Sequence, residues 1–443
     1  MDRKANRRTF LKTAGATGVG LGFLGGAPAI WTSGGRPADK IVVGVMGVNS
    51  RGHALAQAFA RQPDVHVGFL CDVDAAALGK CSATVAGMQD GAPKGFGDIR
   101  KMLESNDLDA VAIAVPDHWH TTAALMAMSA GKHVYLEKPG SHNPQEAHWL
   151  VEGQRRHNRL VQLGTQRRSS PVFMDAMAMV HDGMIGEVYL GKAWYANTRG
   201  SIGRGQPAAV PDGLDYALWQ GPAPRRPFRD NLIHYNWHWF RHWGTGEACN
   251  NGTHHIDICR WALGVDYPTR VTSAGGRFAF QDDWEFFDTQ IMSFEFAGGK
   301  TITWEGRSCN GMPVNGKGFG VTIHGTGGSL LIDSSGYTFF DAKSTEMKTF
   351  AAGSGDDGLN PVGGGEMTDL HVGNFCEAIR GNAALRQPIA EGYKSAMLCH
   401  LGNIAQFTTG ALQCDPASGA ILHNDAANAL WGRTYEPGWE PRL

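Results

Sequence analysis

Short apolar strands alternate with helices between residues 40 and 164, and this alternation limits the possible folds more than any other feature of the chain. Each strand is a Val-, Ile-, Leu- or Ala-rich run that ends at a glycine, a proline or an acidic residue. Strands joined by helices pair in parallel within one sheet. The pattern predicts a doubly wound parallel sheet of α/β class. The strands are expected at 40–46, 66–72, 109–115, 133–138 and 160–164, with helices at 53–61, 98–104, 121–130 and from about 143.

The first strand runs into the turn Gly47-Val48-Asn49-Ser50-Arg51-Gly52, which has the spacing G-x-N-x-x-G. Gly47 permits a tight turn, and Gly52 permits close packing of the following helix on the strand. Asn49 stands where the second glycine usually lies, and asparagine tolerates the left-handed conformation better than most residues. With a strand before it and a helix after it, the turn predicts a dinucleotide cradle formed by Gly47, Asn49, Ser50, Arg51 and Gly52.

Asp72 ends the second strand, 25 residues after Gly47. A carboxylate there usually binds the adenosine ribose of the coenzyme, and it would repel a 2′-phosphate. The position therefore predicts NAD as the cofactor. Arg51 lies close enough in the sequence to leave NADP open. The alternative role for Asp72 is the N-cap of the helix that follows.

The segment Glu137-Lys138-Pro139 ends the strand that begins at His133. Proline cannot donate to a strand ladder and pushes the preceding residue toward extended geometry, so the strand must stop here. Open α/β sheets carry their chemistry at the carboxyl ends of the strands. Glu137 and Lys138 are therefore candidate site residues, and the alternative is a surface ion pair at a strand end.

The second half of the chain predicts an α+β domain built on a large, mostly antiparallel open sheet. Glycine and charged turns separate apolar runs at 186–194, 270–280, 288–296, 300–306, 319–324 and 329–332, and helices are expected at 366–380 and 392–408. Residues 351–365, rich in Gly and Asp, are expected to be a mobile loop. We predict the dinucleotide-binding Rossmann domain at 40–167 and the substrate-binding and oligomerisation domain at 168–443.

The turn at Gly47, the segment Val-Pro-Asp-His-Trp-His at 115–120 and the Glu-Lys-Pro strand end together resemble the glucose–fructose oxidoreductase/inositol dehydrogenase (Gfo/Idh/MocA) family. The resemblance extends from about residue 40 to 410. It implies that Pro116 and His120 line the cofactor, that Glu137 helps to hold it, and that Lys138 faces substrate and nicotinamide. It also implies a homodimer or homotetramer formed through the open face of the second sheet.

The second cluster of polar residues is Asn250-Asn251-Gly252-Thr253-His254-His255-Ile256-Asp257. It is similar to the family pattern Asp-x-Gly-x-His-x-x-Asp on a helix, with Asn250 in place of the first Asp. The resemblance implies that His254 is the general acid or base at the substrate hydroxyl, a task that the near-neutral pKa of an imidazole suits. Asn250 would bind substrate without sharing a proton, and His255 and Asp257 are further candidate substrate contacts. The alternative for His254 is a histidine satisfied within its helix.

Aromatic residues are dense between His234 and Trp243. Trp237 and His238 are candidate contacts for a sugar ring, and core packing is the alternative. Histidines at 234, 238 and 242 could line one helix face and bind a metal. No carboxylate or Cys completes such a set in the sequence, so no metal site is predicted.

The first 29 residues are expected to be a twin-arginine signal peptide, followed by a linker at 30–39. Arg7 and Arg8 precede an apolar pair, residues 14–30 are small and mildly apolar, and Ala27-Pro28-Ala29 resembles a cleavage site. The chain is therefore expected to be exported to the periplasm without a membrane anchor. The eight scattered cysteines predict buried free thiols, and a net charge of −2 gives no bulk field for nucleic acid.

Together these features predict an exported NAD(P)-dependent oxidoreductase that acts on a sugar or polyol hydroxyl by hydride transfer. Because no free nicotinamide pool is expected outside the cytoplasm, the cofactor should stay bound and be recycled internally. Two alternatives remain: a redox-neutral glycosidase or epimerase that works through a transient keto-sugar, and a non-catalytic sugar- or nucleotide-binding scaffold. The particular sugar and the carbon that reacts are left open.

Overall fold

The computed structural model describes residues 40–351, 365–408 and 410–443. The predicted signal peptide and linker, and the predicted loop at 351–365 except for its two end residues, lie outside these ranges. The described N-terminal part contains a six-stranded parallel sheet in the order β3-β2-β1-β4-β5-β6, which confirms the predicted doubly wound fold. Its strands are β1 (Ile41–Met46), β2 (Val65–Cys71), β3 (Lys94–Phe96), β4 (Ala110–Ile113), β5 (His133–Leu136) and β6 (Val161–Leu163).

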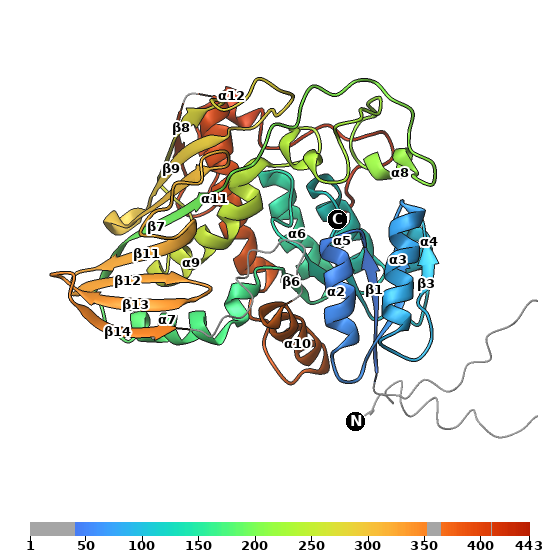
Figure 1. Ribbon diagram of the computed structural model, residues 1–443, viewed down its shortest axis with the longest axis horizontal. Helices are drawn as coiled ribbons and strands as arrows, with labels where there is room; N and C mark the ends of the chain where they lie inside the picture. Colours follow the sequence, from blue (N-terminus) through green and yellow to red (C-terminus); the bar gives the residue numbers. More distant parts are fainter. Residues whose placement is uncertain (1–39, 352–364, 409) are drawn as a thin grey trace, which may run out of the picture. The chain divides into compact units, whose positions relative to one another are not determined.

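Helices cover both faces of this sheet (Figure 1). One apolar layer contains Leu55 and Phe59 of α2, and the other contains Ala124 of α5 and Leu150 of α6. All six residues of β1 are buried, as expected for a central strand covered on both sides. The helices are α2 (Arg51–Ala60), α3 (Ala75–Ala86), α4 (Ile99–Leu103), α5 (Asp117–Ser129) and α6 (Pro144–His157).

Helix α5 begins at Asp117, four residues before the predicted start at Thr121. The Pro-Asp-His-Trp-His segment, which was expected to terminate the strand at 109–115, therefore forms the first turn of the helix, with Pro116 as its N-cap. Helix α6 begins with a capping box. The Asn143 side chain accepts a hydrogen bond from the Glu146 backbone N–H, and the Glu146 carboxylate accepts one from the His142 N–H.

The second sheet has ten strands in the order β14-β13-β12-β11-β7-β10-β9-β8-β15-β16, and it is antiparallel except where β10 pairs with β7. Helices α9 and α11 pack on one of its faces (Figure 1). The described strands are β7 (Val188–Ala196), β8 (Arg270–Gly276), β9 (Thr289–Glu295), β10 (Thr301–Arg307), β11 (Phe319–Gly325), β12 (Gly328–Asp333), β13 (Gly336–Asp341), β14 (Glu346–Ala351), β15 (Ala411–Cys414) and β16 (Ile421–Leu422).

Helix α10 belongs to the C-terminal half of the chain but packs on the first sheet. Its Val372 and Phe375 join the cluster of Phe59, and α10 contacts α2 directly. These contacts cross the predicted boundary at residue 167, which stays a prediction. The remaining helices are α7 (Pro171–His181), α8 (Tyr216–Gln220), α9 (Thr253–Leu263), α10 (Glu366–Arg380), α11 (Ile389–Phe407) and α12 (Asp425–Asn428), with short turns η1 (Gln166–Ser169), η2 (Asn236–Trp239), η3 (Ala248–Gly252) and η4 (Ala297–Gly299).

All eight cysteines are free thiols, and all but Cys309 are buried, as the sequence predicts. Among the described residues, no helix is both long enough and apolar enough to cross a bilayer.

Candidate active site

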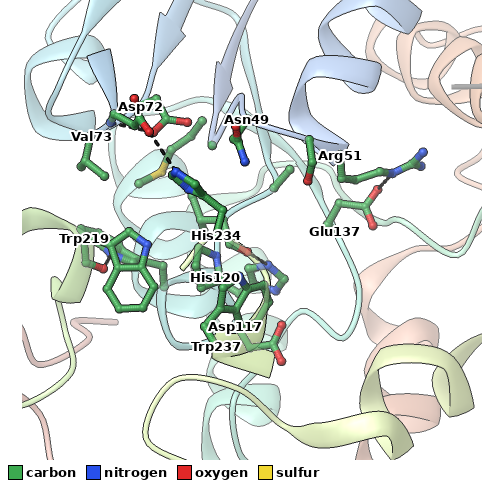
Figure 2. Close-up of a pocket in the computed structure, with 18 of the residues that line it drawn as sticks. Asn49, Arg51, Asp72, Val73, Asp117, His120, Glu137, Trp219, His234 and Trp237 are labelled. Carbon is green, nitrogen blue, oxygen red and sulfur yellow. Dashed lines mark hydrogen bonds and ion pairs between the residues drawn. The ribbon is translucent and has the colours of Figure 1, made fainter. Parts of the chain in front are cut away.

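One cavity is lined by residues from both halves of the chain (Figure 2). The Rossmann strands contribute residues at their carboxyl ends, and the segment from 234 to 254 contributes the opposite wall. Most of the residues predicted from the sequence meet here. The predicted residues on its wall are Gly47, Asn49, Ser50, Arg51, Asp72, Pro116, His120, Glu137, Lys138, Trp237, His238, Asn250 and His254.

The glycine turn has the geometry that its two glycines predict. Gly47 has φ of +80°, which disfavours any residue with a Cβ. A Cβ on Gly52 would lie 1.7 Å from the Gly47 carbonyl oxygen, so helix α2 can approach the strand this closely only with glycine there. Asn49 does not use the left-handed conformation that was expected to rescue the missing glycine. The turn delivers the start of α2 to the cavity, where a helix N-terminus favours a pyrophosphate.

Asp72 lies at the end of β2, on the cavity wall. Its carboxylate accepts backbone hydrogen bonds from Val48 at 2.6 Å and from Asp74 at 2.9 Å. Burial raises the pKa of Asp72, and these two N–H groups offset part of that rise. The alternative role as a helix N-cap is wrong, because Asp74 caps α3. Asp72 is therefore fixed in place, and its remaining lone pairs are available to ribose hydroxyls.

Arg51 does not lie beside Asp72 (Figure 2). Its Nε donates to the Glu137 carboxylate at 2.8 Å, and its Nη1 donates to the Thr368 hydroxyl at 3.1 Å. The guanidinium is thus held toward Glu137 and α10 rather than over the ribose position. Arg51 therefore does not neutralise the Asp72 carboxylate. A negative charge at the ribose position would repel the 2′-phosphate of NADP, which fits NAD.

Lys138 and Asn250 meet across the cavity. The Lys138 Nζ donates to the Asn250 Oδ1 at 2.8 Å, although the residues are 112 positions apart in the chain. Burial lowers the pKa of Lys138, and the negative charges of Glu137, Asp117 and Glu247 act in the opposite direction. We call residues 40–167 the first lobe and residues 168–443 the second lobe. The first lobe thus contributes an ammonium group, and the second holds it in place.

Glu247 was not predicted from the sequence, yet it lies behind this contact. Its carboxylate accepts from the Asn250 side chain at 3.3 Å and from Arg199 at 2.8 Å. Glu247 precedes the π-helical turn η3, which places Asn250 above it. An aspartate at 250 would place a negative charge next to Lys138. Here Glu247 carries the negative charge instead, and Asn250 contacts both Glu247 and Lys138. The sequence signal was an acid three residues before Asn250.

His254 lies on the cavity wall and is 7% exposed. Its Nδ1 has no hydrogen-bond partner among the described residues. Burial lowers the pKa of His254 well below its usual value, and the nearby positive charges of Lys138 and Arg167 lower it further. The expected near-neutral pKa is therefore wrong for this state of the site. This shift favours the neutral imidazole, which is the form that accepts a proton.

Asp257 and His255 do not reach the cavity, and neither does Gly52. Asp257 lies one helical turn beyond His254, and there its carboxylate is paired with Arg168 at 2.7 Å. His255 is bonded through Nδ1 to the Asn251 carbonyl. The predicted substrate contacts of Asp257 and His255 thus find no support, because neither side chain lines the cavity and both are bonded to other groups.

The aromatic segment forms part of the cavity wall but not a helix with three aligned histidines. Only residues 236–239 are helical, as the short turn η2. Trp237 and His238 stack with ring centroids 3.6 Å apart, while His234 faces Asp74 at 3.0 Å. His242 turns elsewhere, to the Pro224 carbonyl. No group of metal-ligating side chains occurs among the described residues.

Asp117 is a wall residue that the sequence did not single out. Its carboxylate accepts a 2.5 Å hydrogen bond from the Thr245 hydroxyl, a contact between the two lobes. Burial raises the pKa of Asp117 to about 7. His120 lies about one turn further along α5 and is bonded to the Val115 carbonyl. Burial lowers the pKa of His120 to about 4. The signal for Asp117 was its place directly after Pro116.

Solved structures with the same fold cover most of the chain. An NAD-binding oxidoreductase from Klebsiella pneumoniae has a TM-score of 0.65 at 20% identity, over 84% of this chain and 99% of that one. A levoglucosan dehydrogenase in complex with NADH and levoglucosan has a TM-score of 0.66 at 18% identity, with the same coverage. At these identities the likeness shows the fold alone.

Curated relatives align over a shorter stretch. A glycosyl hydrolase family 109 protein from Saccharopolyspora erythraea is 34% identical over 211 residues, which is 43% of this chain and 45% of that protein. One from Shewanella baltica is 26% identical over 209 residues. The chain thus spans less than half of the length of these relatives.

Two family models match the chain in sequence. The model of the oxidoreductase family with an NAD-binding Rossmann fold matches residues 41–165, and the model of the α/β C-terminal domain of the same family matches residues 219–400. The first contains the glycine turn, Asp72 and Lys138, and the second contains Asn250 and His254. The chain therefore belongs to the Gfo/Idh/MocA oxidoreductase family, and its cofactor is NAD.

Proposed function

We propose that this protein oxidises a secondary hydroxyl of a sugar or polyol by hydride transfer to NAD. The contact between Lys138 and Asn250 carries the proposal, because it joins the two lobes inside the cavity that contains the glycine turn. His254 lines the same cavity with an unpartnered ring nitrogen. A cation and a neutral base at one point suit an alcohol that must lose a proton and a hydride.

The wall residues divide the task in three. The start of α2 and Asp72 bind the dinucleotide, whose nicotinamide supplies the hydride acceptor. Lys138, fixed by Asn250, donates a hydrogen bond to the substrate oxygen and stabilises the negative charge that develops on it. His254 accepts the hydroxyl proton on a ring nitrogen. The stacked rings of Trp237 and His238 offer a flat apolar surface to the carbon face of a sugar.

The purified protein tests this proposal directly. We expect a denatured extract to release a stoichiometric nicotinamide dinucleotide, and a panel of sugars and polyols to contain at least one that reduces it. Reduction is followed by nicotinamide absorbance. If the protein contains no nucleotide and binds none when NAD is added, the proposal is wrong.

A redox-neutral reaction is the second candidate, favoured by the alignment with glycosyl hydrolase family 109 proteins. In that case NAD would oxidise the sugar only transiently, with Lys138 and His254 in the same roles. Glycosidic cleavage or epimerisation would follow, and the reduced nicotinamide would return the hydride to the sugar. We expect product sugar without net nicotinamide reduction if this candidate is correct. A non-catalytic scaffold, suggested by Asn49 and Asn250, would show binding and neither signal.

The charge of Glu247 is expected to contribute to the pKa of Lys138. Glu247→Gln removes a negative charge that raises this pKa, so the alkaline limb of the kcat/KM profile should move to lower pH. Asn250→Asp adds a carboxylate at the 2.8 Å contact and should move the same limb to higher pH. Shifts in the same direction, or unchanged profiles in both variants, would show that Lys138 is not the titrating group.

We also propose export of the protein by the twin-arginine route with its coenzyme already bound. The support is the sequence Arg7-Arg8-Thr9-Phe10-Leu11 and the predicted cleavage site. Arg7→Lys/Arg8→Lys should leave the chain in the cytoplasmic fraction, whereas the natural sequence should appear in the periplasm. Equal distribution of both chains would contradict export by this route.

A homodimer or homotetramer through the open face of the second sheet remains a proposal. Its support is the alternation in β9 and β10, where Met292 and Trp304 are buried beneath the helices and Ile291, on the opposite face, is 53% exposed. We expect Ile291→Glu to lower the mass measured by light scattering. A monomeric natural protein would rule the proposal out.

A further inference from the structure

A second cavity lies apart from the coenzyme cavity and shares no wall residue with it. It has a volume of about 680 Å³, which is enough for a small organic molecule. The start of α6, the segment from 241 to 245 and the end of α11 form its walls, together with residues 430–433. Neither the predicted chemistry nor the comparisons assign it a role.

Several nitrogen atoms of residues that line it are buried and have no hydrogen-bond partner in the part of the chain that the structure describes. They are the Asn143 Nδ2, the Arg433 Nη1 and both ring nitrogens of His142. Asn143 is only 5% exposed. Its Oδ1 is used by the cap of α6, so only its donor group remains. Buried polar groups are costly unless they are paired, and this set is dominated by donors.

Positive charge also exceeds negative charge on the wall of this cavity. Arg226 and Arg241 form no ion pair with a carboxylate among the described residues, and the Arg241 guanidinium lies 3.9 Å from the ring centroid of Phe407. Arg433 is already paired with Glu146 through Nε, which leaves Nη1 unused. One carboxylate, Glu285, is on the wall, and its Oε2 accepts from the Arg241 backbone N–H. Arginines therefore outnumber acidic groups three to one.

We propose that this second cavity binds a small organic oxyanion, a carboxylate or a phosphate monoester with an apolar portion. The oxyanion would accept from Arg433, Asn143 and the exposed arginines, because guanidinium and amide N–H groups match its lone pairs. The apolar portion would lie against Phe286, Phe407 and Leu430, which complete the wall. A neutral ligand would leave the charges of Arg226 and Arg241 without a carboxylate partner.

The cavity touches the active site through one contact. Thr245 lines the second cavity, and its hydroxyl donates to Asp117 on the wall of the coenzyme cavity. The oxyanion site is therefore adjacent to the coenzyme site but separate from it, and the inference does not depend on the proposed reaction. Because the pyrophosphate position of the coenzyme cavity also attracts anions, the test keeps NAD in excess.

Calorimetric titration of the full chain with phenyl phosphate, benzoate and inorganic phosphate, at constant ionic strength, tests the proposal. Benzamide is the neutral control for benzoate. We expect saturable binding of phenyl phosphate or benzoate, and the stronger of the two identifies the anion class. Arg226→Gln/Arg241→Gln should weaken binding by at least about tenfold. Asn143→Ser removes the free donor but keeps a helix cap, and it should weaken binding as well.

Arg156→Gln is the matched control, because Arg156 is exposed in the last turn of α6 and does not line the cavity. It should bind the probes like the natural protein. The proposal is overturned if no probe binds beyond the chloride background, if benzamide binds as well as benzoate, or if both test variants retain full affinity. Circular dichroism of each variant confirms that a loss of binding is not a loss of fold.

Discussion

Replacing Lys138 with alanine is expected to lower kcat/KM by about 10²- to 10⁴-fold, the range that a positioned proton-transfer or charge-stabilising group contributes. Its Nζ is the group that Asn250 holds at 2.8 Å, and alanine leaves only space there. Lys138→Arg should not restore activity, because a guanidinium is larger and planar, and it cannot place its N–H groups where the Lys138 Nζ lies. The measurement is steady-state kinetics with the best substrate of the sugar and polyol panel.

Coenzyme binding separates a catalytic role from a general loss of the site. Asp72 and the glycine turn lie on other strands, so Lys138→Ala should retain NAD while losing turnover. Lys101→Ala is the matched control, because the Lys101 side chain is 67% exposed and pairs only at the surface with Glu104. If Lys138→Ala turned over substrate as fast as the natural protein, Lys138 would have no role in catalysis.

His254→Ala, alone and combined with Lys138→Ala, tests whether the two residues act on the same hydroxyl. If Lys138 and His254 act on one hydroxyl, the double variant should be little worse than the weaker of the two single variants, since groups that work as a unit lose their effects together. Fully multiplicative losses would indicate two independent sites of action. The shared cavity and the effect of the Lys138 charge on the pKa of His254 favour the first outcome.

Local patterns were sufficient for most of the first sheet and for its coenzyme turn. The strand at 41–46 is a continuous apolar run, Gly47 and Gly52 have steric roles that their spacing indicates, and Asn143 caps α6 as its sequence context predicts. Helix α10 was predicted with its observed bounds, 366–380. These features depend on residues a few positions apart, which a sequence displays directly.

The parts that failed depend on contacts between distant segments. Nothing near Glu247 in the chain indicates that its carboxylate accepts from Arg199, 48 residues earlier, nor that Asp117 accepts from Thr245, 128 residues later. The lowered pKa of His254 follows from burial, and the type of residue cannot reveal that. The pairing of Lys138 with Asn250 could be anticipated only because family resemblance placed both at one site.

The spacing Asp-x-Gly-x-His-x-x-Asp suggested Asp257 as a substrate contact, but its carboxylate is paired with Arg168. Its replacement should have a large effect on stability. Asp257→Ala is expected to lower the free energy of unfolding by about 3–5 kcal/mol, because it leaves the largely buried Arg168 guanidinium without its carboxylate. Gln387 and Ser395 would lose an acceptor as well. Thermal unfolding followed by circular dichroism measures the change.

Acidification should have a related effect. Burial tends to raise the pKa of Asp257, but Arg168 and Ser395 outweigh it and hold the pKa below its usual value. A carboxyl group with a lowered pKa in the folded state stabilises the fold above its unfolded pKa, and this contribution is lost as the pH falls through the folded value. The natural protein should therefore lose stability in acid, and Asp257→Ala should lose less over the same range.

The matched control is Asp266→Ala. Asp266 also pairs with an arginine, Arg260 at 3.0 Å, but its side chain is 57% exposed, and without it Arg260 keeps a second carboxylate, Glu391 at 3.4 Å. The loss should therefore stay below about 1 kcal/mol. The comparison also decides between the two roles considered for Asp257. A substrate ligand would show a raised KM with normal stability, whereas a buried structural partner shows the reverse. The closed network around Asp257 leads us to expect a normal KM in the folded fraction of the variant.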